Sequence, residues 1–339
     1  MGGSSEERSV SLASGCQVSV ALREAGHEVV SIDSAVGVLP RDVEERLLTA
    51  PIGSVDVSLP ARAGGGLADA EVIASDGALQ EVDVVFLALH GGAGEDGTIQ
   101  TLLDVAGVPY AGSGPVGCAL AMDKDLTKRL LRDAGIATPD WILGRTPGDE
   151  VLDRLGSPVI VKPAQGGSSV RLRLATDGTE VDRASDEALG GGDEVMYEAY
   201  VAGREFTVGI LDGQPLPVVE IIPEHELFDF ECKYLDGMAQ EIAPAQIDDG
   251  LRAELQRLAL EVHRTLRLRH FSRVDFMMDA SGALYCLEAN ALPGLTANSL
   301  LPKAASAAGI EFPELCDRIC RMGFASRGGD GGTGAPPGG

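Results

Sequence analysis

The sequence predicts a mixed α/β fold, because short apolar strands alternate along it with helices that end at glycines. The apolar run VDVVFLAL at 82–89 predicts a fully buried strand, and a Gly-rich loop then leads into a helix from about Thr98. A second apolar run, PVIVK at 158–162, is followed by another Gly-rich loop. The chain has 339 residues, 44% of them apolar, which is enough for two or three domains.

Composition excludes several classes of protein. No apolar run of about 18 residues is present, and no basic segment precedes an apolar one, so neither a membrane span nor secretion is expected. The six cysteines are scattered, as in reduced cytoplasmic proteins. A net charge of -25 disfavours nucleic acid or anionic lipid as a partner. Arginine outnumbers lysine 22 to 5, so a lysine inside a motif is a candidate for a phosphate site.

The first 112 residues predict an open α/β domain. A helix is expected from about Val10 to Ala25, ending at Gly26, and a strand over 27–33. A Gly-rich turn that enters a helix normally follows a buried strand, but none precedes Gly2-Gly3. We therefore expect this domain to lack its first strand and the chain to lack upstream residues, for example through a misplaced start. Residues 50–80 read as a loop-rich insertion.

The loop after the 82–89 strand is a candidate ligand site. It runs from His90 to Gly97, and Asp96 is placed to cap the following helix. A strand, a Gly-rich loop and a helix N-terminus in succession form a place where ligands approach an open α/β domain. His90 is either a ligand-binding residue or an ordinary turn histidine.

The middle of the chain brings lysines to loop positions. A helix capped by Asp123 starts at Lys124 and closes at Gly135. The 158–163 strand presents Lys162 at its end, and residues 164–169 then turn back into a strand over 170–174. Glycines and serines in that turn suit a flap over phosphates, although a plain hairpin loop is the alternative.

The C-terminal half predicts strands, a lid and helices. The strand at 194–200 carries Glu198, and a hairpin over 204–222 turns at Asp212-Gly213. Residues 223–244 lack clear periodicity, as lids often do. Helices are expected over 248–266 and 300–322, and a disordered tail over 326–339.

The stretch from Phe271 to Leu300 predicts a hairpin with a polar face. A four-residue turn at 279–282 would place Arg273 opposite Glu288 and Asp275 opposite Cys286. Arg273, Asp275, Glu288 and Asn290 would then share one face, with Val274, Phe276, Leu287 and Ala289 on the other. Three oxygen donors and a guanidinium suit Mg²⁺ with an anion, whereas a solvated charged face is the alternative.

The order of these motifs resembles the D-alanine-D-alanine ligase family of the ATP-grasp superfamily. The resemblance rests on the following stretches: SSEERSVSLASG, HGGAGEDGTIQ, YAGSGP, MDKDLTK, VIVKPAQGGSSV, YEAYVAGREFTVGIL, CKYLDG, SRVDFMMD and LEANALPGLTANSLLP. It implies a three-domain ATP-grasp fold. The N-terminal domain would cover 1–112, the central ATP-grasp subdomain 113–198 and the C-terminal catalytic subdomain 199–325, followed by the tail at 326–339.

The resemblance also implies an activity and its cofactors. Two D-alanines would be joined at the expense of ATP through an acyl phosphate, for the cell wall, with two Mg²⁺ ions or with Mn²⁺ in their place. The protein would be a cytoplasmic homodimer with no nucleic-acid or membrane partner. A D-alanine-D-lactate, D-alanine-D-serine or other amino-acid ligase, and an inactive ATP-binding module, are the alternatives.

The resemblance assigns a role to each matched residue. ATP phosphates would be held by Lys124 and Lys162 under a flap that contains Ser168 and Ser169, and Glu198 and Glu205 would meet the adenine and ribose. Lys233 would serve both ATP and, with Ser299, the carboxylate of the second D-alanine. Glu7 would bind the ammonium of the first D-alanine beside His90, and Ser168 and Tyr234 would bond to close the lid. Arg273 and the Gly294 amide would stabilise the oxyanion, and Asp275, Glu288 and Asn290 would bind the metal ions.

Three positions depart from the family pattern. Gly166 stands where a larger, often acidic residue is common, Arg171 where a glycine is usual, and Ala199 where a lysine is frequent. Tyr234 favours the dipeptide product, since lactate-forming relatives usually carry another residue there.

Overall fold

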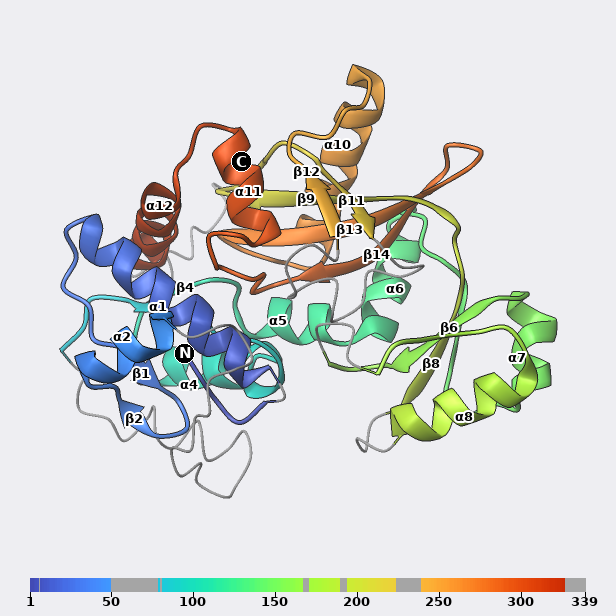
Figure 1. Ribbon diagram of the computed structural model, residues 1–339, viewed down its shortest axis with the longest axis horizontal. Helices are drawn as coiled ribbons and strands as arrows, with labels where there is room; N and C mark the ends of the chain where they lie inside the picture. The colour runs from blue at the N-terminus through green and yellow to red at the C-terminus, as the bar shows by residue number, and fades with distance from the viewer. Residues whose placement is uncertain are drawn as a thin grey trace, which may run out of the picture.

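The structure is a computed structural model of the whole chain, and it describes residues 1–5, 7–49, 79, 81–166, 171–189, 194–223 and 239–326. Figure 1 shows three parts, with the N-terminal elements beside the C-terminal sheet and its helices, and a separate sheet with α7 and α8 on the opposite side. None of the helices in these residues is long and apolar enough to cross a membrane. The predicted domain boundaries and the disordered tail stay predictions.

The N-terminal part contains helices around two small sheets. Its elements are α1 (Arg8–Glu24), β1 (Ile32–Asp33), β2 (Gly37–Val38), α2 (Arg41–Thr49), β3 (Val85–Phe86), η2 (Gly92–Gly94), α4 (Thr98–Ala106) and β4 (Tyr110–Ala111). The strands pair as β1 with β2, antiparallel, and β3 with β4, parallel. The first helix ends as predicted, because Gly26 has a φ of +92°, which favours glycine.

Two strand predictions were too long. Only β1 forms within the predicted 27–33 strand, and only β3 forms within 82–89. The second was also predicted to be fully buried, yet Val85 and Phe86 are half-buried and only Leu87, Ala88 and Leu89 after them are buried. An apolar run does not reveal how far the backbone pairs, and β4 offers β3 only two residues to pair with.

The start of the chain lies beside β1. The amino group of Met1 donates a hydrogen bond to the Ile32 carbonyl (2.9 Å), and the Ser34 amide donates to the Met1 carbonyl (3.0 Å). The predicted upstream strand stays a prediction. So does the loop-rich insertion, of which the structure describes only Leu79.

The middle part is a four-stranded antiparallel sheet in the order β5-β8-β6-β7. Its elements and the two helices before them are α5 (Pro115–Met122), α6 (Lys124–Asp133), β5 (Trp141–Leu143), α7 (Gly148–Leu155), β6 (Val159–Pro163), β7 (Arg173–Ala175), α8 (Gly178–Leu189) and β8 (Val195–Ala199). Apolar residues of α7 and α8 pack on the sheet in a core of its own. The helix after Asp123 and the strands carrying Lys162 and Glu198 are where the sequence predicted them.

The C-terminal part is built on a sheet in the order β12-β11-β9-β13-β14, with β10 paired to β9. Its elements are β9 (Gly203–Leu211), β10 (Gln214–Pro215), β11 (Val219–Pro223), β12 (Ala239–Ile242), α10 (Asp249–Thr265), β13 (Phe271–Asp279), β14 (Leu284–Asn290), α11 (Leu300–Ala307) and α12 (Phe312–Ala325). Helix α10 packs on one core with β9 and β13, whereas α11 and α12 share another with α1 and α4. The predicted 300–322 helix is two helices, separated at Gly309 (φ +80°).

Candidate functional site

The predicted hairpin exists as β13 and β14, but its register differs from the prediction. Arg273 lies opposite Asn290, and Asp275 lies opposite Glu288. The turn is one residue longer than expected, since Asp279 and Ala283 close it by a backbone hydrogen bond (3.0 Å), and the pairing shifts by another residue at a bulge between Asp275 and Phe276. Cys286, rather than Leu287, therefore faces the core with Phe276.

The four polar residues share a face, as predicted. The Arg273 guanidinium donates two hydrogen bonds to the Asp275 carboxylate, from Nε to Oδ1 (3.0 Å) and from Nη2 to Oδ2 (2.9 Å). Asn290 Nδ2 donates to the same Oδ2 (3.2 Å), and Thr207 Oγ1 on β9 donates to Oδ1 (2.6 Å). Asp275 is only 5% exposed, so these bonds compensate for the burial of its charge.

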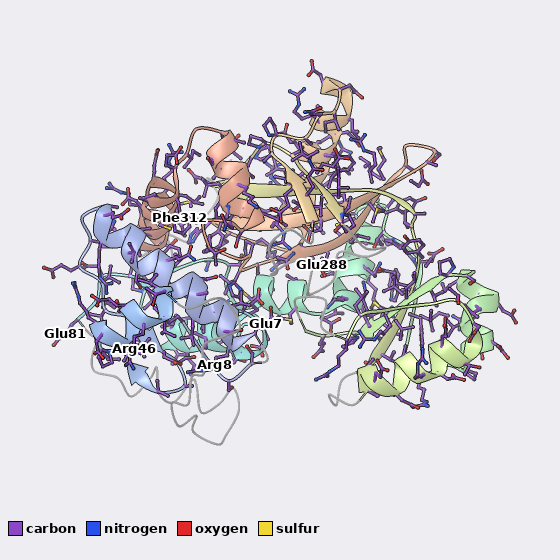
Figure 2. All side chains as sticks on the ribbon, viewed as in Figure 1. Glu7, Arg8, Arg46, Glu81, Glu288 and Phe312 are labelled. Atoms are coloured by element: carbon purple, nitrogen blue, oxygen red, sulfur yellow. The ribbon has the colours of Figure 1, made fainter. Side chains whose placement is uncertain are left out.

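Glu288 opens onto a small cavity at the end of this face. The cavity, about 30 Å³, is lined by Lys124, Gly166, Glu288 and Asn290 together with Glu95 from the N-terminal part. Figure 2 labels Glu288 on the hairpin and Glu7 at the start of α1. The structure thus brings one predicted phosphate lysine to the predicted metal face.

Lys124 also holds the start of the predicted flap. Its Nζ donates a hydrogen bond to the Gly166 carbonyl (2.5 Å), and its backbone amide donates to the Ala164 carbonyl (3.1 Å). Asp123 caps α6 by accepting a hydrogen bond from the Leu126 amide (2.9 Å), which fixes Lys124 at the first turn of the helix.

Glu198 and Lys162 meet in the middle sheet, together with a residue that the sequence analysis missed. Lys162 Nζ donates to Glu198 Oε1 (2.9 Å), and Lys128 Nζ lies 2.5 Å from Glu198 Oε2. Lys128 follows Lys124 by one helical turn, and the scarcity of lysine that singled out its neighbours also applied to it. Burial tends to raise the pKa of Glu198, but the two ammonium groups prevail and lower it, so the carboxylate is charged.

Glu205, predicted with Glu198 to meet the adenine and ribose, lies two residues before Thr207 and on the same face of the sheet. It is half-buried on β9, where it is paired with Met277 on one side and Ile221 on the other.

His90 connects three parts of the chain. Its Nδ1 lies 3.1 Å from the Leu292 carbonyl and its Nε2 lies 3.1 Å from Ser14 Oγ, while its backbone amide donates to Ser11 Oγ (2.8 Å). Burial lowers the pKa of His90 to about 4, so the ring is neutral at pH 7. A neutral ring whose Nδ1–H donates to Leu292 must accept at Nε2 from the Ser14 hydroxyl. Both ring nitrogens of His90 therefore have partners within the protein, and its predicted place beside the first substrate stays a prediction.

The carboxyl group of Glu95 lies near that of Glu7, and the sequence did not predict this neighbour. Glu7 is 5% exposed and approaches Gly91, where an added Cβ would lie 2.6 Å from its Oε2. Glu95 accepts a hydrogen bond from the Gly91 amide (2.7 Å). Burial, and then the charge of Glu7, raise the pKa of Glu95 to about 8. Its position in the Gly-rich loop after His90 was the signal available in the sequence.

The loop between β14 and α11 brings Gly294 and Ser299 together. An added Cβ on Gly294 would lie 2.9 Å from Ser299 Oγ, so only glycine fits there without a shift. Ser299 Oγ accepts a hydrogen bond from the Thr296 amide (3.1 Å). The Leu295 amide of the same loop donates to Ser14 Oγ (3.4 Å), which ties the loop to α1 and His90.

Four predicted residues lie outside the described part of the chain: Ser168, Ser169, Lys233 and Tyr234. The proposed flap and lid contacts, including the link from Ser168 to Tyr234, therefore stay predictions. At the edges of the flap, Gly166 has a φ of +106° and Arg171 a φ of +60°. The unusual glycine thus occupies a conformation that favours glycine, whereas Arg171 adopts one that disfavours arginine.

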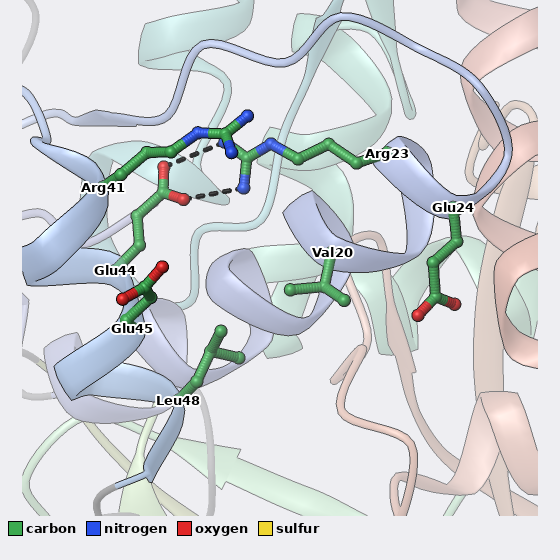
Figure 3. Close-up of a pocket in the computed structure, with 7 residues that line it drawn as sticks. All are labelled: Val20, Arg23, Glu24, Arg41, Glu44, Glu45 and Leu48. Atoms are coloured by element: carbon green, nitrogen blue, oxygen red, sulfur yellow. Dashed lines mark hydrogen bonds and ion pairs between the residues drawn. The ribbon is translucent and has the colours of Figure 1, made fainter.

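A larger cavity of about 360 Å³ lies away from this site, between α1 and α2. Figure 3 shows Arg23 and Arg41 both directed at Glu44 within it. This cavity holds the Arg23–Glu44 ion pair (2.7 Å), and none of the residues predicted for the functional site lines it.

The hairpin face fits Mg²⁺ by the kind of donors it offers. Two carboxylates stand directly opposite each other, and an amide flanks them, which are the oxygen ligands that Mg²⁺ prefers. Within the part of the chain that the structure describes, no group of three or more His, Cys, Asp and Glu side chains gathers as a ready metal site. Substrate phosphate oxygens would have to complete the coordination, as is usual for Mg²⁺.

Comparisons with known proteins agree on one family. The family model described as D-ala D-ala ligase N-terminus matches residues 1–113, and the one described as D-ala D-ala ligase C-terminus matches residues 130–321. A D-alanine–D-alanine ligase from Syntrophotalea carbinolica is 39% identical over 320 residues, 94% of this chain and 93% of the relative.

Solved structures give the same result. The D-alanine–D-alanine ligase from Bacillus anthracis complexed with ATP superposes with a TM-score of 0.75 at 31% identity, covering 96% of each chain. A D-Ala:D-Ser ligase from Enterococcus faecalis has a TM-score of 0.78 at 26% identity, covering 95% of this chain and 97% of its own.

Proposed function

Because this chain belongs to the D-alanine–D-alanine ligase family, we propose that it condenses two D-alanines to D-alanyl-D-alanine with ATP, for peptidoglycan precursor synthesis. The observation that carries the proposal is the meeting of Lys124, Glu288 and Asn290 around one cavity, together with the buried Lys162–Glu198 pair of the middle sheet. This site supports phosphoryl transfer, which needs cations and metal-binding oxygens around a nucleotide.

The reaction has two steps. A carboxylate oxygen of the first D-alanine attacks the γ-phosphorus of ATP, the bond to the bridging oxygen breaks, and ADP leaves. The amine of the second D-alanine then attacks the acyl carbon, phosphate leaves, and one proton is released. We assign Glu198 and Glu205 to the nucleoside and Lys124 and Lys162 to its phosphates.

The substrates would lie between the hairpin and the N-terminal part. We assign Glu7 and His90 to the first D-alanine, Ser299 and Lys233 to the carboxylate of the second, and the flap and lid to Ser168, Ser169 and Tyr234. Mg²⁺, held by Asp275, Glu288 and Asn290, would neutralise phosphate charge. Arg273 and the Gly294 amide would stabilise the tetrahedral oxyanion, and losing one such donor typically costs about 10²–10³ in rate.

The cellular setting and assembly follow the same reasoning. The family resemblance and the absence of a membrane-spanning helix from the described residues support a cytoplasmic enzyme, which we propose acts as a homodimer. Its strongly negative charge supports small-molecule substrates over nucleic acid or anionic membranes.

The proposal is tested by mixing purified protein with ATP, Mg²⁺ and D-alanine and measuring phosphate release and dipeptide. Phosphate release that depends on D-alanine is expected. ATP binding without such release would instead identify an inactive ATP-binding module. D-serine and D-lactate are tested beside D-alanine as second substrates, because the D-Ala:D-Ser ligase structure shows that this fold accommodates more than one acceptor.

The metal assignment is tested by Glu288→Gln, which keeps the size of the side chain and removes its charge. Turnover should fall below detection at neutral pH while the thermal unfolding midpoint stays within a few degrees of the parent. Glu314→Gln is the control, because Glu314 is a half-exposed residue of α12 paired with Arg318. A Glu288→Gln enzyme that keeps its activity would show that Glu288 is not a metal ligand.

A further inference from the structure

We infer that Lys128 is a positioning residue that holds Glu198 when ATP draws Lys162 away to its phosphates; the inference rests on the proposed function. The feature behind it is a buried cluster of two lysines and one glutamate. Lys128 Nζ lies 2.5 Å from one carboxylate oxygen of Glu198, and Lys162 Nζ lies 2.9 Å from the other. One carboxylate thus has two cationic partners where charge balance needs only one.

The two lysines differ in how firmly the fold holds them. Lys128 is 0% exposed, and its ammonium also donates hydrogen bonds to Thr138 Oγ1 (2.8 Å) and to the Pro139 carbonyl (3.0 Å). Its Nζ lies 5.3 Å from the centre of the Trp141 ring, a cation–π distance. Lys162 is 7% exposed, and within the described part of the chain its ammonium has one hydrogen-bond acceptor, Glu198.

This difference separates a fixed partner from an exchangeable one. If Lys162 were the sole partner of Glu198, moving its ammonium to a phosphate would leave a buried carboxylate unpaired, which is costly. With Lys128 in place, Glu198 keeps a cation throughout. Glu198 stays oriented toward the nucleoside, while the charge of Lys162 becomes available to the phosphates.

The first experiment compares Lys128→Met with Arg129→Met. Arg129 is the next residue of α6, exposed and ion-paired to Asp125 (2.7 Å), so its variant removes a cation and an ion pair outside the cluster. Lys128→Met should raise the KM for ATP at least about tenfold, with kcat changed by less than about threefold. Binding of adenosine, which carries no phosphate, should weaken by less than about threefold. Arg129→Met should leave all three values near those of the parent.

Two results would overturn the inference from these variants. Equal loss of ATP and adenosine affinity in Lys128→Met would indicate a merely structural role for Lys128. An unchanged KM for ATP would indicate that Lys128 has no role in ATP binding. A parent enzyme without D-alanine-dependent phosphate release would refute the proposed function instead, so the two failures are distinguishable.

A second experiment needs no variant at Lys128 to fold. The chain has five lysines, so protein labelled with ¹³C at lysine Cε gives few signals. The signals of the four lysines other than Lys128 can each be assigned by a single substitution to arginine, which leaves the remaining signal to Lys128. Adding a non-hydrolysable ATP analogue should shift the Lys162 signal and leave that of Lys128 unchanged. A shift at Lys128 with none at Lys162 would reverse the assigned roles and overturn the inference.

Discussion

At the scale of single residues, Arg171 carries backbone strain at the edge of the predicted flap. Its φ of +60° lies in the left-handed region, which costs a non-glycine residue about 1–2 kcal/mol. Arg171→Gly should therefore raise the free energy of unfolding by up to about 1 kcal/mol, since the greater freedom of glycine in the unfolded chain offsets part of the gain. Urea denaturation measures this. Arg173→Gly, in the extended strand β7, is the control and should destabilise.

At the scale of elements, the hairpin shows what the sequence could and could not predict. The polar face was correct because side chains alternate along a strand, and the register error at Glu288 and Asn290 amounts to two residues, which preserves the alternation. One residue of that error comes from the turn and one from the bulge. Neither is encoded in the pattern of polar and apolar residues, so Leu287 was assigned to the wrong face. Helix caps such as Asp123 were predictable because they depend on local sequence alone.

Those caps allow a matched test of helix α6. Asp123 caps α6 and Asp248 caps α10, each by accepting a hydrogen bond from an amide three residues later at 2.9 Å. Replacing either with alanine should lower the free energy of unfolding by about 1 kcal/mol. Only Asp123→Ala should also raise the KM for ATP, because α6 begins at Lys124 and carries Lys128. Similar KM values for the two variants would show that the helix start does not position the site.

At the scale of the whole molecule, the site depends on contacts that the sequence could not reveal. One core joins α1 and α4 to α11 and α12. Hydrogen bonds beside it link His90 to Ser14 and Leu292, and Leu295 to Ser14, which is 281 residues away in the sequence. Motifs predicted which residues matter, since each motif is local. They gave no sign that Glu95 would meet Glu7 or that Lys128 would meet Glu198, because folding alone brings those pairs together.

The same junction holds two buried groups, His90 and Glu95, whose pKa values are shifted by the fold. His90, buried at the junction, has a pKa lowered from 6.5 to about 4, so the unfolded chain binds its proton first as the pH falls. The stabilisation from neutral His90 is complete above pH 6.5 and is lost progressively between about pH 6.5 and 4. Glu95, whose pKa is raised to about 8, acts in the opposite direction between about pH 8 and 4.5, so the parent protein shows only the net effect. His90→Gln should therefore be less stable than the parent at pH 7.5, where it loses the hydrogen bonds of the buried ring, and its slope of stability against pH should be smaller than that of the parent by up to about 1.4 kcal/mol per pH unit. Urea denaturation from pH 7.5 to 5 measures both slopes, and equal slopes would show that His90 is not held neutral by the fold.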